Sequence, residues 1–487
     1  MGKFNSLKYS IVFNTLGILI FFLGLSMIFP LFYALYYQEE VAIYAFLSSI
    51  IITSLSGLFL HFNFKTEDGI GRKEGFAIAT LGWIIAAAFG SFPFLFSGTL
   101  TNFIDAYFES MSGFTTTGAT VLQYIEGNPL SVLFWRNQIQ WIGGMGIIVL
   151  VVAILPALGV GGMQLFKLEV PGPEPDKLKP RIKETAKLLY LVYIIISVLQ
   201  VVCLYLTGMS LFDAITHMFG TMATGGFTPK NLSVGHYNSP TYDMIMIFFM
   251  LIAGANFTLH YKVLHGDLKS LFKDREFLFY LGVIVISIFI ITTQLHLYIY
   301  KSILTALRYA SFQVVSVITT TGFATTNFDQ WPTLSKSILI ILMFIGGCAG
   351  STGGAIKNIR ILILLKKVGR EFQRILHPHA ITPIYVGDKK ISDEVASNVT
   401  SFFLLYIMIF VFSSLVMAAL GLDLVSAMTS VAATLGNVGP GLGLVGPTQN
   451  YAFIPPLGKI LLSLCMLLGR LEIYTVFILL IPEFWKN

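Results

Sequence analysis

Charged residues are scarce in this sequence. Asp, Glu, Lys and Arg make up 11% of its 487 residues, whereas hydrophobic residues make up 55% and the mean hydropathy is +0.78. Soluble domains carry about 25% charged residues, so this composition excludes an ordinary soluble protein. Several apolar runs reach the roughly 20 residues that a helix needs to cross a bilayer. The sequence therefore predicts an all-α polytopic membrane protein.

Residues that carry metal or covalent chemistry are also few. The three cysteines, Cys203, Cys348 and Cys465, lie far apart in apolar segments without metal-ligand spacing, which favours buried apolar side chains. The eight histidines form no ligand pair. The sequence lacks a phosphate-binding glycine loop, a Rossmann pattern and a nucleophile–base pair. We therefore predict that the chain is not an enzyme and binds no nucleotide itself.

The net charge of +6 is distributed as a topology signal and not as a nucleic-acid-binding patch. Most Lys and Arg fall into five regions that the predicted spans place on one side of the membrane. These regions are 3–8, 65–73, 167–187, 262–275 and 357–390. Because Lys and Arg concentrate in cytoplasmic loops, we predict that both termini are cytoplasmic and that no nucleic acid binds. A secondary role of these basic loops as a docking face stays open.

Four short stretches rich in Thr and Gly interrupt the apolar pattern, and we call them the glycine stretches. They lie at 114–120, 223–228, 319–325 and 433–439. The glycines that we align are Gly118, Gly225, Gly322 and Gly436, which are 107, 97 and 114 residues apart. A unit of roughly 100 residues is therefore used four times. The fourth stretch is the loosest match, because Leu435 stands where the first and third stretches have a second Thr.

Each glycine stretch follows a segment too short to span and precedes one long enough to do so. The predicted spans are 10–36, 41–62, 74–96, 131–166, 183–205, 243–264, 276–298, 334–366, 394–420 and 456–481. The half-length segments are 103–114, 210–222, 303–317 and 423–433. These ten spans divide the chain into two extra N-terminal helices and four helix–loop–helix repeats in a pseudo-fourfold arrangement. The predicted boundaries are 1–66, 67–180, 181–270, 271–390 and 391–487.

We interpret the four glycine stretches as the walls of one ion-selective filter. Irregular backbone at membrane depth is tolerated only inside protein or along a wet cavity, and a ring of carbonyls can replace a cation's hydration shell. The half-length helices would point their negative C-terminal ends at a cation. Close helix packing is the alternative for any single stretch. The predicted filter residues are Thr116, Thr117, Gly118, Ala223, Thr224, Gly225, Thr320, Thr321, Gly322, Thr434, Leu435, Gly436 and Asn437.

A second glycine-rich segment, 346–355, interrupts the predicted span 334–366. Five glycines in ten residues disfavour a helix by about 1 kcal/mol each relative to Ala. We interpret this segment, called the glycine loop below, as a gate across the ion path, and a tight packing face is the alternative. The predicted gate residues in the loop are Gly346, Gly347, Gly350, Ser351, Thr352, Gly353 and Gly354.

Two arginines lie within predicted spans, where a charge is costly. Arg470, at the middle of the last span, is predicted to face the pore as a barrier to cations; an ion pair with a carboxylate on a neighbouring helix is the alternative. Glu472 lies two residues further on and should have a different partner, because residues two apart do not share a helix face. Arg136 lies near the outer end of its helix and is predicted to snorkel to the membrane interface.

Taken together, these motifs resemble the TrkH and TrkG family, the membrane subunits of bacterial Trk potassium uptake systems, with the KtrB and HKT transporters as distant relatives. The resemblance covers essentially the whole chain, including the two extra N-terminal helices. Its most specific stretches are 111–120, 140–146, 346–357 and 469–472.

The resemblance implies that the transported ion is K⁺, bound in the filter, and that Gly118 belongs to the potassium-selective pattern. It also implies the gate roles of the glycine loop and Arg470, a homodimer in the bacterial inner membrane, and a cytosolic ring of TrkA-like subunits that binds NADH, ATP or ADP. The resulting expectation is channel-like potassium uptake. A symporter that couples K⁺ to H⁺ or Na⁺ is the alternative, because broken helices also occur in transporters.

Overall fold

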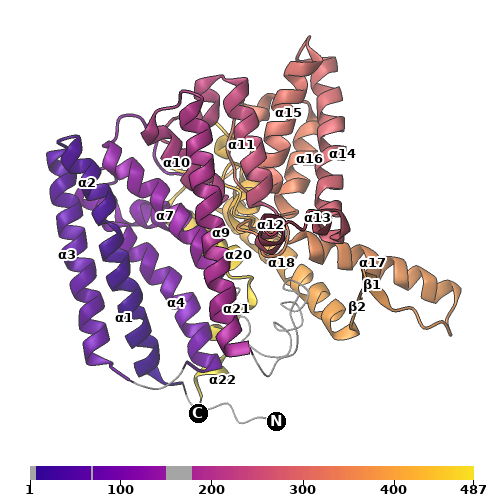
Figure 1. The fold of residues 1–487 in the computed structure, drawn as a ribbon, viewed down its shortest axis with the longest axis horizontal. Coiled ribbons are helices and arrows are strands. Elements are labelled where there is room, and N and C mark those ends of the chain that lie inside the picture. Colours follow the sequence, from indigo (N-terminus) through magenta and orange to yellow (C-terminus); the bar gives the residue numbers. More distant parts are fainter. Residues whose placement is uncertain (1–6, 67–69, 150–177, 487) are drawn as a thin grey trace.

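The computed structural model describes residues 7–66, 70–149 and 178–486. Helices make up most of these residues, so the predicted α-helical class is confirmed. In Figure 1 the N-terminal helices form one edge of the molecule, and the helices of the third repeat form the opposite edge. A short antiparallel hairpin, which was not predicted from the sequence, lies between the third and fourth repeats.

The two extra N-terminal spans pack against each other and against the first repeat. The first consists of α1 (Tyr9–Ser26) and α2 (Ile28–Tyr36), and the second is α3 (Glu40–Asn63). A Cβ added at Gly57 would lie 2.7 Å from the carbonyl oxygen of Gly17, so glycines permit this close helix contact. Glu39 accepts hydrogen bonds from the backbone N–H groups of Leu130 (2.6 Å) and Ser131 (3.1 Å), which ties this pair of spans to the first repeat.

Each repeat contains an outer helix, a short helix and an inner helix. In the first repeat the outer helix is α4 (Arg72–Gly90) with the turn α5 (Phe92–Phe96), the short helix is α6 (Phe103–Phe114) and the inner helix is α7 (Leu130–Val149). The part of the predicted span 131–166 beyond Val149 lies outside the described residues.

In the second repeat the outer helix is α9 (Leu178–Leu206) and the short helix is α10 (Leu211–Met222). The prediction of one continuous inner span over 243–264 was wrong. This span consists of α11 (Pro240–Ala253) and α12 (Phe257–Leu264), which bend by 103°. Asn256 begins α12 because its side chain accepts a hydrogen bond from the N–H of Thr258 at 2.8 Å. The 3-10 turn η4 (Ser233–Tyr237) precedes α11, and α13 (Lys269–Lys273) ends the repeat.

In the third repeat the outer helix is α14 (Arg275–Tyr298) and the short helix is α15 (Ile303–Ile318). The inner segment is broken, as predicted, into α16 (Thr333–Phe344) and α17 (Asn358–Leu376) with the glycine loop between them. The 3-10 turn η5 (Phe328–Gln330) precedes α16, and the hairpin of β1 (Ile384–Val386) and β2 (Lys389–Ile391) follows α17.

In the fourth repeat the outer helix is α18 (Asp393–Ala419) and the short helix is α19 (Leu424–Leu435), followed by η6 (Gly443–Val445). The continuous span predicted over 456–481 was also wrong. The helix α20 (Pro456–Arg470) ends at Arg470, and the chain bends by 111° into α21 (Tyr474–Phe477) and η7 (Ile478–Leu480). Arg470 therefore lies at a helix end and not at a helix centre. The last element is α22 (Pro482–Trp485).

The helix lengths agree with a membrane protein of many spans. Over the described residues, six helices are long and apolar enough to cross a bilayer, and the two bent pairs could each add one. The remaining two predicted spans are the one that continues beyond Val149 and the one that the glycine loop interrupts. Large apolar side chains such as Phe22, Phe59 and Phe289 are more than 60% exposed, as expected for a surface that lipid covers. The chain is a polytopic α-helical membrane protein.

The four repeats follow one another around an axis. Each short helix contacts the outer helix of its own repeat, in the pairs α4–α6, α9–α10, α14–α15 and α18–α19. Each inner helix contacts the short helix of the next repeat, in the pairs α7–α10, α11–α15, α16–α19 and α20–α6. Because the last pair returns to the first repeat, the arrangement is closed. This ring brings the C-terminal ends of the four short helices together.

Candidate ion pathway

All four short helices end in the same strained turn. The second residue after the helix has a positive φ, at Thr116, Thr224, Thr320 and Asn437, with values between 52° and 59°. At each site this residue bonds to the carbonyl three positions earlier, and the next N–H bonds to the carbonyl five positions earlier, as in a Schellman motif. Threonine is unfavourable there because its branched Cβ clashes in the left-handed region. Three threonines with this strain point to a functional site.

A glycine with positive φ follows two residues later in every repeat. These glycines are Gly118 (82°), Gly226 (72°), Gly322 (77°) and Gly439 (98°). The alignment of Gly225 and Gly436 with Gly118 was therefore wrong, by one residue and by three residues. Gly436 ends α19, and Leu435 lies within that helix. Ala223 ends α10 in the same way.

The sequence signal for the correct register was present but weak. Two consecutive glycines, Gly225 and Gly226, made the second stretch ambiguous, and the fourth stretch has Asn437 where the others have Thr. Asn tolerates positive φ better than Thr does, so it can occupy the strained position. A Thr or Asn two residues before a glycine selects Gly226 in the second stretch, but in the fourth stretch this spacing fits both Gly436 and Gly439.

The four glycine stretches form a closed ring. A Cβ added at Gly118 would lie 2.1 Å from the carbonyl oxygen of Gly225. The corresponding distances are 2.0 Å from Gly226 to Thr321, 1.9 Å from Gly322 to Val438, and 2.6 Å from Gly439 to Thr117. Each glycine thus lies against the carbonyl that precedes the glycine of the next repeat. Any side chain at these positions would push two stretches apart.

Side chains behind the ring hold the stretches in place. Gln140 of α7 donates to the carbonyl of Gly225 at 2.6 Å and accepts from the N–H of Phe227 at 3.0 Å. The amide of Asn437 donates to Thr117 Oγ1 at 2.9 Å, which joins the fourth stretch to the first. Gln140 belongs to the stretch 140–146 that carries the family resemblance, but its role depends on a contact with a distant repeat that no local pattern marks.

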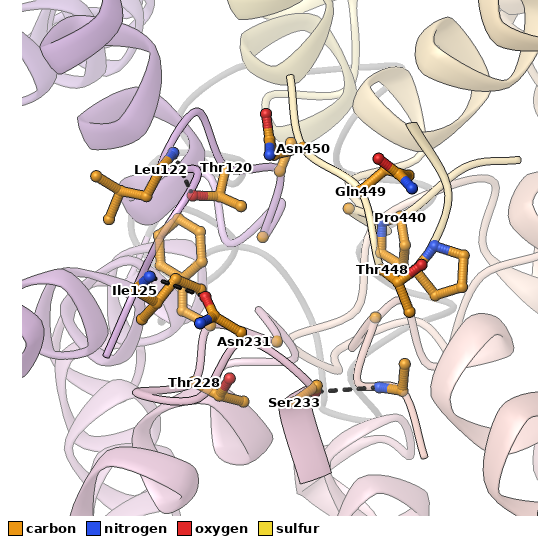
Figure 2. Close-up of a pocket in the computed structure, with 18 of the residues that line it drawn as sticks. Thr120, Leu122, Ile125, Thr228, Asn231, Ser233, Pro440, Thr448, Gln449 and Asn450 are labelled. Atoms are coloured by element: carbon orange, nitrogen blue, oxygen red, sulfur yellow. Dashed lines mark hydrogen bonds between the residues drawn. The ribbon is translucent and has the colours of Figure 1, made fainter. Parts of the chain in front are cut away.

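A small cavity lies on one side of the ring. It has a volume of about 120 Å³, and all four positive-φ glycines line it. Figure 2 shows how the repeats surround it, with Thr120 from the first, Asn231 and Ser233 from the second, and Gln449 and Asn450 from the fourth. Gly322 and Ala324 complete its wall from the third repeat. A small ion could reach the ring from this cavity.

Arg136 braces the wall of this cavity. The prediction that it snorkels to the interface was wrong, because its side chain is only 1% exposed. Its Nε lies 2.6 Å from Glu109 Oε1, its Nη1 donates to the carbonyl of Thr228 at 3.0 Å, and its guanidinium lies 3.6 Å from the centre of the Phe227 ring. Glu109 also accepts hydrogen bonds from Thr120 Oγ1 and from the N–H of Val121, both at 2.8 Å. This buried ion pair therefore joins the outer ends of the first and second stretches.

Two further ion pairs join neighbouring repeats at the short helices. Lys459 of α20 lies 2.6 Å from Asp105 of α6, and Arg308 of α15 lies 2.7 Å from Asp243 of α11. Each pair connects a short helix with the inner helix of the preceding repeat. The pairs therefore reinforce the same cyclic contacts that close the ring.

The glycine loop lies against the side of the ring opposite the cavity. Its base is closed by hydrogen bonds between Gly346 and Ile356 and between Ile356 and Phe344. The N–H of Gly354 donates to Thr320 Oγ1 at 2.7 Å, and Thr352 Oγ1 donates to the carbonyl of Met222 at 3.0 Å. A Cβ added at Gly354 would lie 2.6 Å from the carbonyl oxygen of Gly436. The loop thus contacts the ends of the second, third and fourth short helices.

Arg470 connects the glycine loop with the first repeat. It is 2% exposed, and its Nη1 and Nη2 donate to the carbonyls of Thr352 (2.7 Å) and Gly143 (3.2 Å). No carboxylate forms an ion pair with it among the described residues, so the alternative of a structural ion pair is not supported there. Glu472 instead pairs with Arg360 of α17, as expected for residues with different partners. The next residue, Ile473, has φ 58° and ψ −61°, an unusual and strained conformation.

The fold and this site define a class of protein: a membrane transporter in which four re-entrant segments surround one axis. A family model described as TrkH, cation transport protein, matches residues 42–486. The chain belongs to this family. The TrkH potassium uptake protein of Escherichia coli K12 is 42% identical over 486 residues, which cover 99% of this chain and all of that protein. TrkG of the same strain is 36% identical over 490 residues, covering 99% of this chain and all of that protein.

A solved structure agrees with this assignment. The crystal structure of the potassium transporter TrkH from Vibrio parahaemolyticus matches with a TM-score of 0.90 and 38% identity, covering 99% of this chain and all of that one. The relatives are named as transport proteins, so this member of the family is a transport protein and not an enzyme.

Proposed function

We propose that this protein lets K⁺ enter the bacterial cell through a gated, channel-like pathway. The observation that carries the proposal is the closed ring of glycine stretches, in which a glycine of each repeat lies against the carbonyl of the next. Backbone carbonyls in such a ring can replace the hydration shell of a cation. The relatives are named potassium uptake proteins, which supports K⁺ as the ion.

The filter in this proposal consists of Thr116, Thr117 and Gly118 and their equivalents. These equivalents are Thr224, Gly225 and Gly226 in the second repeat, Thr320, Thr321 and Gly322 in the third, and Asn437, Val438 and Gly439 in the fourth. The stretches are short, so they offer fewer coordination sites than a long filter. We therefore expect Rb⁺ to pass nearly as well as K⁺ and Na⁺ to be only partly excluded.

The gate in this proposal is the glycine loop with Arg470. The loop contacts the short helices of the second, third and fourth repeats. Arg470 joins the loop to α7 of the first repeat through the carbonyl of Gly143. A guanidinium beside the ion path also repels cations, because its charge is little screened in a buried site. Both effects keep the path closed until the loop moves.

The cellular setting follows from the same proposal. The relatives are named as parts of a Trk system, which supports a partner beyond this chain. We propose a homodimer in the inner membrane with cytoplasmic termini and a cytosolic TrkA-like ring that binds NADH, ATP or ADP. The partner would act on the glycine loop, because that loop is joined to α17 and to the β1–β2 hairpin beyond it.

The test is cation flux into liposomes that contain this chain alone. We expect passive K⁺ and Rb⁺ flux that rises in Gly350→Ala and Arg470→Ala, with Lys486→Ala as a charge-matched control outside the pathway. Flux that occurs only with a H⁺ or Na⁺ gradient would refute the channel proposal and support the symporter alternative. Flux unchanged by both gate variants would remove the loop and Arg470 as the barrier.

A further inference from the structure

One carboxylate joins the glycine loop to the helix that follows it. Glu276, in the first turn of α14, accepts hydrogen bonds at a single oxygen, Oε1, from the N–H of Ala349 (2.7 Å) and the N–H of Ile359 (2.9 Å). Ala349 lies within the loop, and Ile359 lies in the first turn of α17. Glu276 is 8% exposed, so water competes little for these bonds. The carboxylate therefore holds the loop to the helix that follows it.

Both donors are groups that need a partner. Ile359 belongs to the first turn of α17, where backbone N–H groups have no acceptor within the helix. Ala349 lies in irregular backbone, where the chain itself supplies few acceptors. A charged acceptor makes hydrogen bonds about twice as strong as a neutral one does. Without the Glu276 carboxylate, these two buried N–H groups would lack a hydrogen-bond acceptor unless water entered.

Other contacts attach the same part of the loop to the bend between α11 and α12. The N–H of Cys348 donates to the carbonyl of Gly254 at 2.8 Å, and the N–H of Phe257 donates to the carbonyl of Gly350 at 3.1 Å. These contacts use backbone atoms that any sequence would supply. Glu276 adds a side chain from a third element, which makes its contribution accessible to mutation.

Glu276 also borders a polar cavity on the opposite side from the ring. This cavity has a volume of about 380 Å³, and Glu276 and Ile359 line it together with residues of α13 and of the β1–β2 turn. The regions 262–275 and 357–390, which the positive-inside rule places in the cytoplasm, form most of its wall. The carboxylate is thus positioned between the loop and the face at which a cytosolic partner would act.

We infer that Glu276 is a positioning residue that holds the glycine loop in its closed arrangement. This inference rests on the proposed function only in that closure of the loop blocks the ion path. Glutamine at this position keeps one oxygen acceptor but loses the charge, and alanine loses both. The loop should therefore open most often in Glu276→Ala, less often in Glu276→Gln and least often in the parent protein.

A native cysteine beside Ala349 can report the opening of the glycine loop. Cys348 is adjacent to Ala349 and is 1% exposed, and only two other cysteines, Cys203 and Cys465, occur in the chain. In a Cys203→Ala, Cys465→Ala background, the rate of maleimide labelling in intact proteoliposomes measures how often the loop opens. We expect the rate to rise about 10-fold in Glu276→Ala, which corresponds to about 1.4 kcal/mol, and about 3-fold in Glu276→Gln.

Glu371→Gln is the matched control, because Glu371 is a half-exposed carboxylate on α17 whose ion pairs within the described residues are with Arg370 and Arg374 of the same helix. It should leave labelling at the parent rate. The elution volume in size-exclusion chromatography checks that each variant is folded. If Glu276→Ala does not fold, the comparison of Glu276→Gln with Glu371→Gln decides the question.

K⁺ flux measured on the same samples separates this inference from the proposed function. Faster labelling with faster flux supports both. Faster labelling with unchanged flux supports Glu276 as the anchor but shows that the loop is not the barrier. Labelling at the parent rate in both Glu276 variants overturns the anchor, whatever the flux.

Discussion

The register of the ring can be tested with two adjacent glycines. Gly226→Ala and Gly225→Ala differ by one position, and only Gly226 has a positive φ. A left-handed conformation costs alanine about 1–2 kcal/mol, which is a factor of about 5 to 30 in an equilibrium constant. In addition, the new Cβ would lie 2.0 Å from the carbonyl oxygen of Thr321, whereas real Cβ contacts are no closer than 3.0 Å. The third stretch would have to retreat by about 1 Å.

Gly225→Ala would clash with a movable side chain and not with backbone. Its Cβ would lie 2.5 to 2.8 Å from the end of the Gln140 side chain, which can change its rotamer. The cost is the loss of the two hydrogen bonds of Gln140, at about 1 kcal/mol each, and this cost falls on stability. The carbonyl of Gly225 can still face Gly118, so the ring is preserved.

We therefore expect Gly226→Ala to reduce K⁺ flux by about 5- to 30-fold in a background whose gate is open, since only the undistorted fraction of molecules conducts. Gly225→Ala should reduce it by less than about 3-fold, with a lower unfolding temperature. The assay is ⁸⁶Rb⁺ uptake into liposomes that contain Gly350→Ala protein at matched density. Equal losses in the two variants, or a larger loss in Gly225→Ala, would show that the positive-φ glycines do not define the filter.

Three further variants test other parts of the site. Arg136→Gln leaves Glu109 buried without its cation and should destabilise the protein by about 3–5 kcal/mol in a thermal unfolding assay, whereas Lys230→Gln, on the same cavity wall, should change stability by less than about 1 kcal/mol. Arg470→Lys keeps the charge, but one ammonium group cannot bond to the carbonyls of Thr352 and Gly143 together. K⁺ flux in this variant should therefore lie between that of the parent and that of Arg470→Gln. Flux as high as in Arg470→Gln would mean that the two hydrogen bonds, and not the charge, close the path. Asn437→Ala removes the bonds to Thr117 and Met466 and should lower stability by about 2–3 kcal/mol in the same unfolding assay, and an unchanged unfolding temperature would contradict a structural role for this amide.

The sequence was sufficient for features that depend on local pattern. Apolar runs of about 20 residues predicted the outer helices α9, α14 and α18 to within a few residues, because hydropathy alone specifies a span. The broken inner segment of the third repeat was also predictable, since the five glycines of the glycine loop disfavour a helix over its whole length. Gly118 and Gly322 were correctly aligned because each follows three consecutive threonines.

Features that depend on distant partners were not predictable. Arg136 resembles an interfacial arginine by position, and only the packing of α7 against α6 places Glu109 within 2.6 Å of it. The bend at 471–473 itself contains no glycine or proline, and the nearby Gly469 lies within α20, so the local pattern does not mark the bend. Its cost is offset by the contacts that Arg470 and Glu472 then make with the glycine loop and with α17.

The bends indicate how a symmetric ring can be combined with the proposed gate on one side. The four turns at the ring share one hydrogen-bond pattern, so the ring itself gives no reason for any repeat to differ. Below it, α11–α12 bends by 103°, α20–α21 bends by 111°, and α16 is separated from α17 by the glycine loop. These breaks expose backbone carbonyls and N–H groups at membrane depth, which must find partners in protein or water. The glycine loop supplies hydrogen-bond partners to the carbonyl of Gly254 and the N–H of Phe257. Arg470 donates to the carbonyls of Thr352 and Gly143. A loop held by exchangeable hydrogen bonds can move while the turns of the ring keep their own backbone hydrogen bonds, and that separation is what the proposed filter with an independent gate requires.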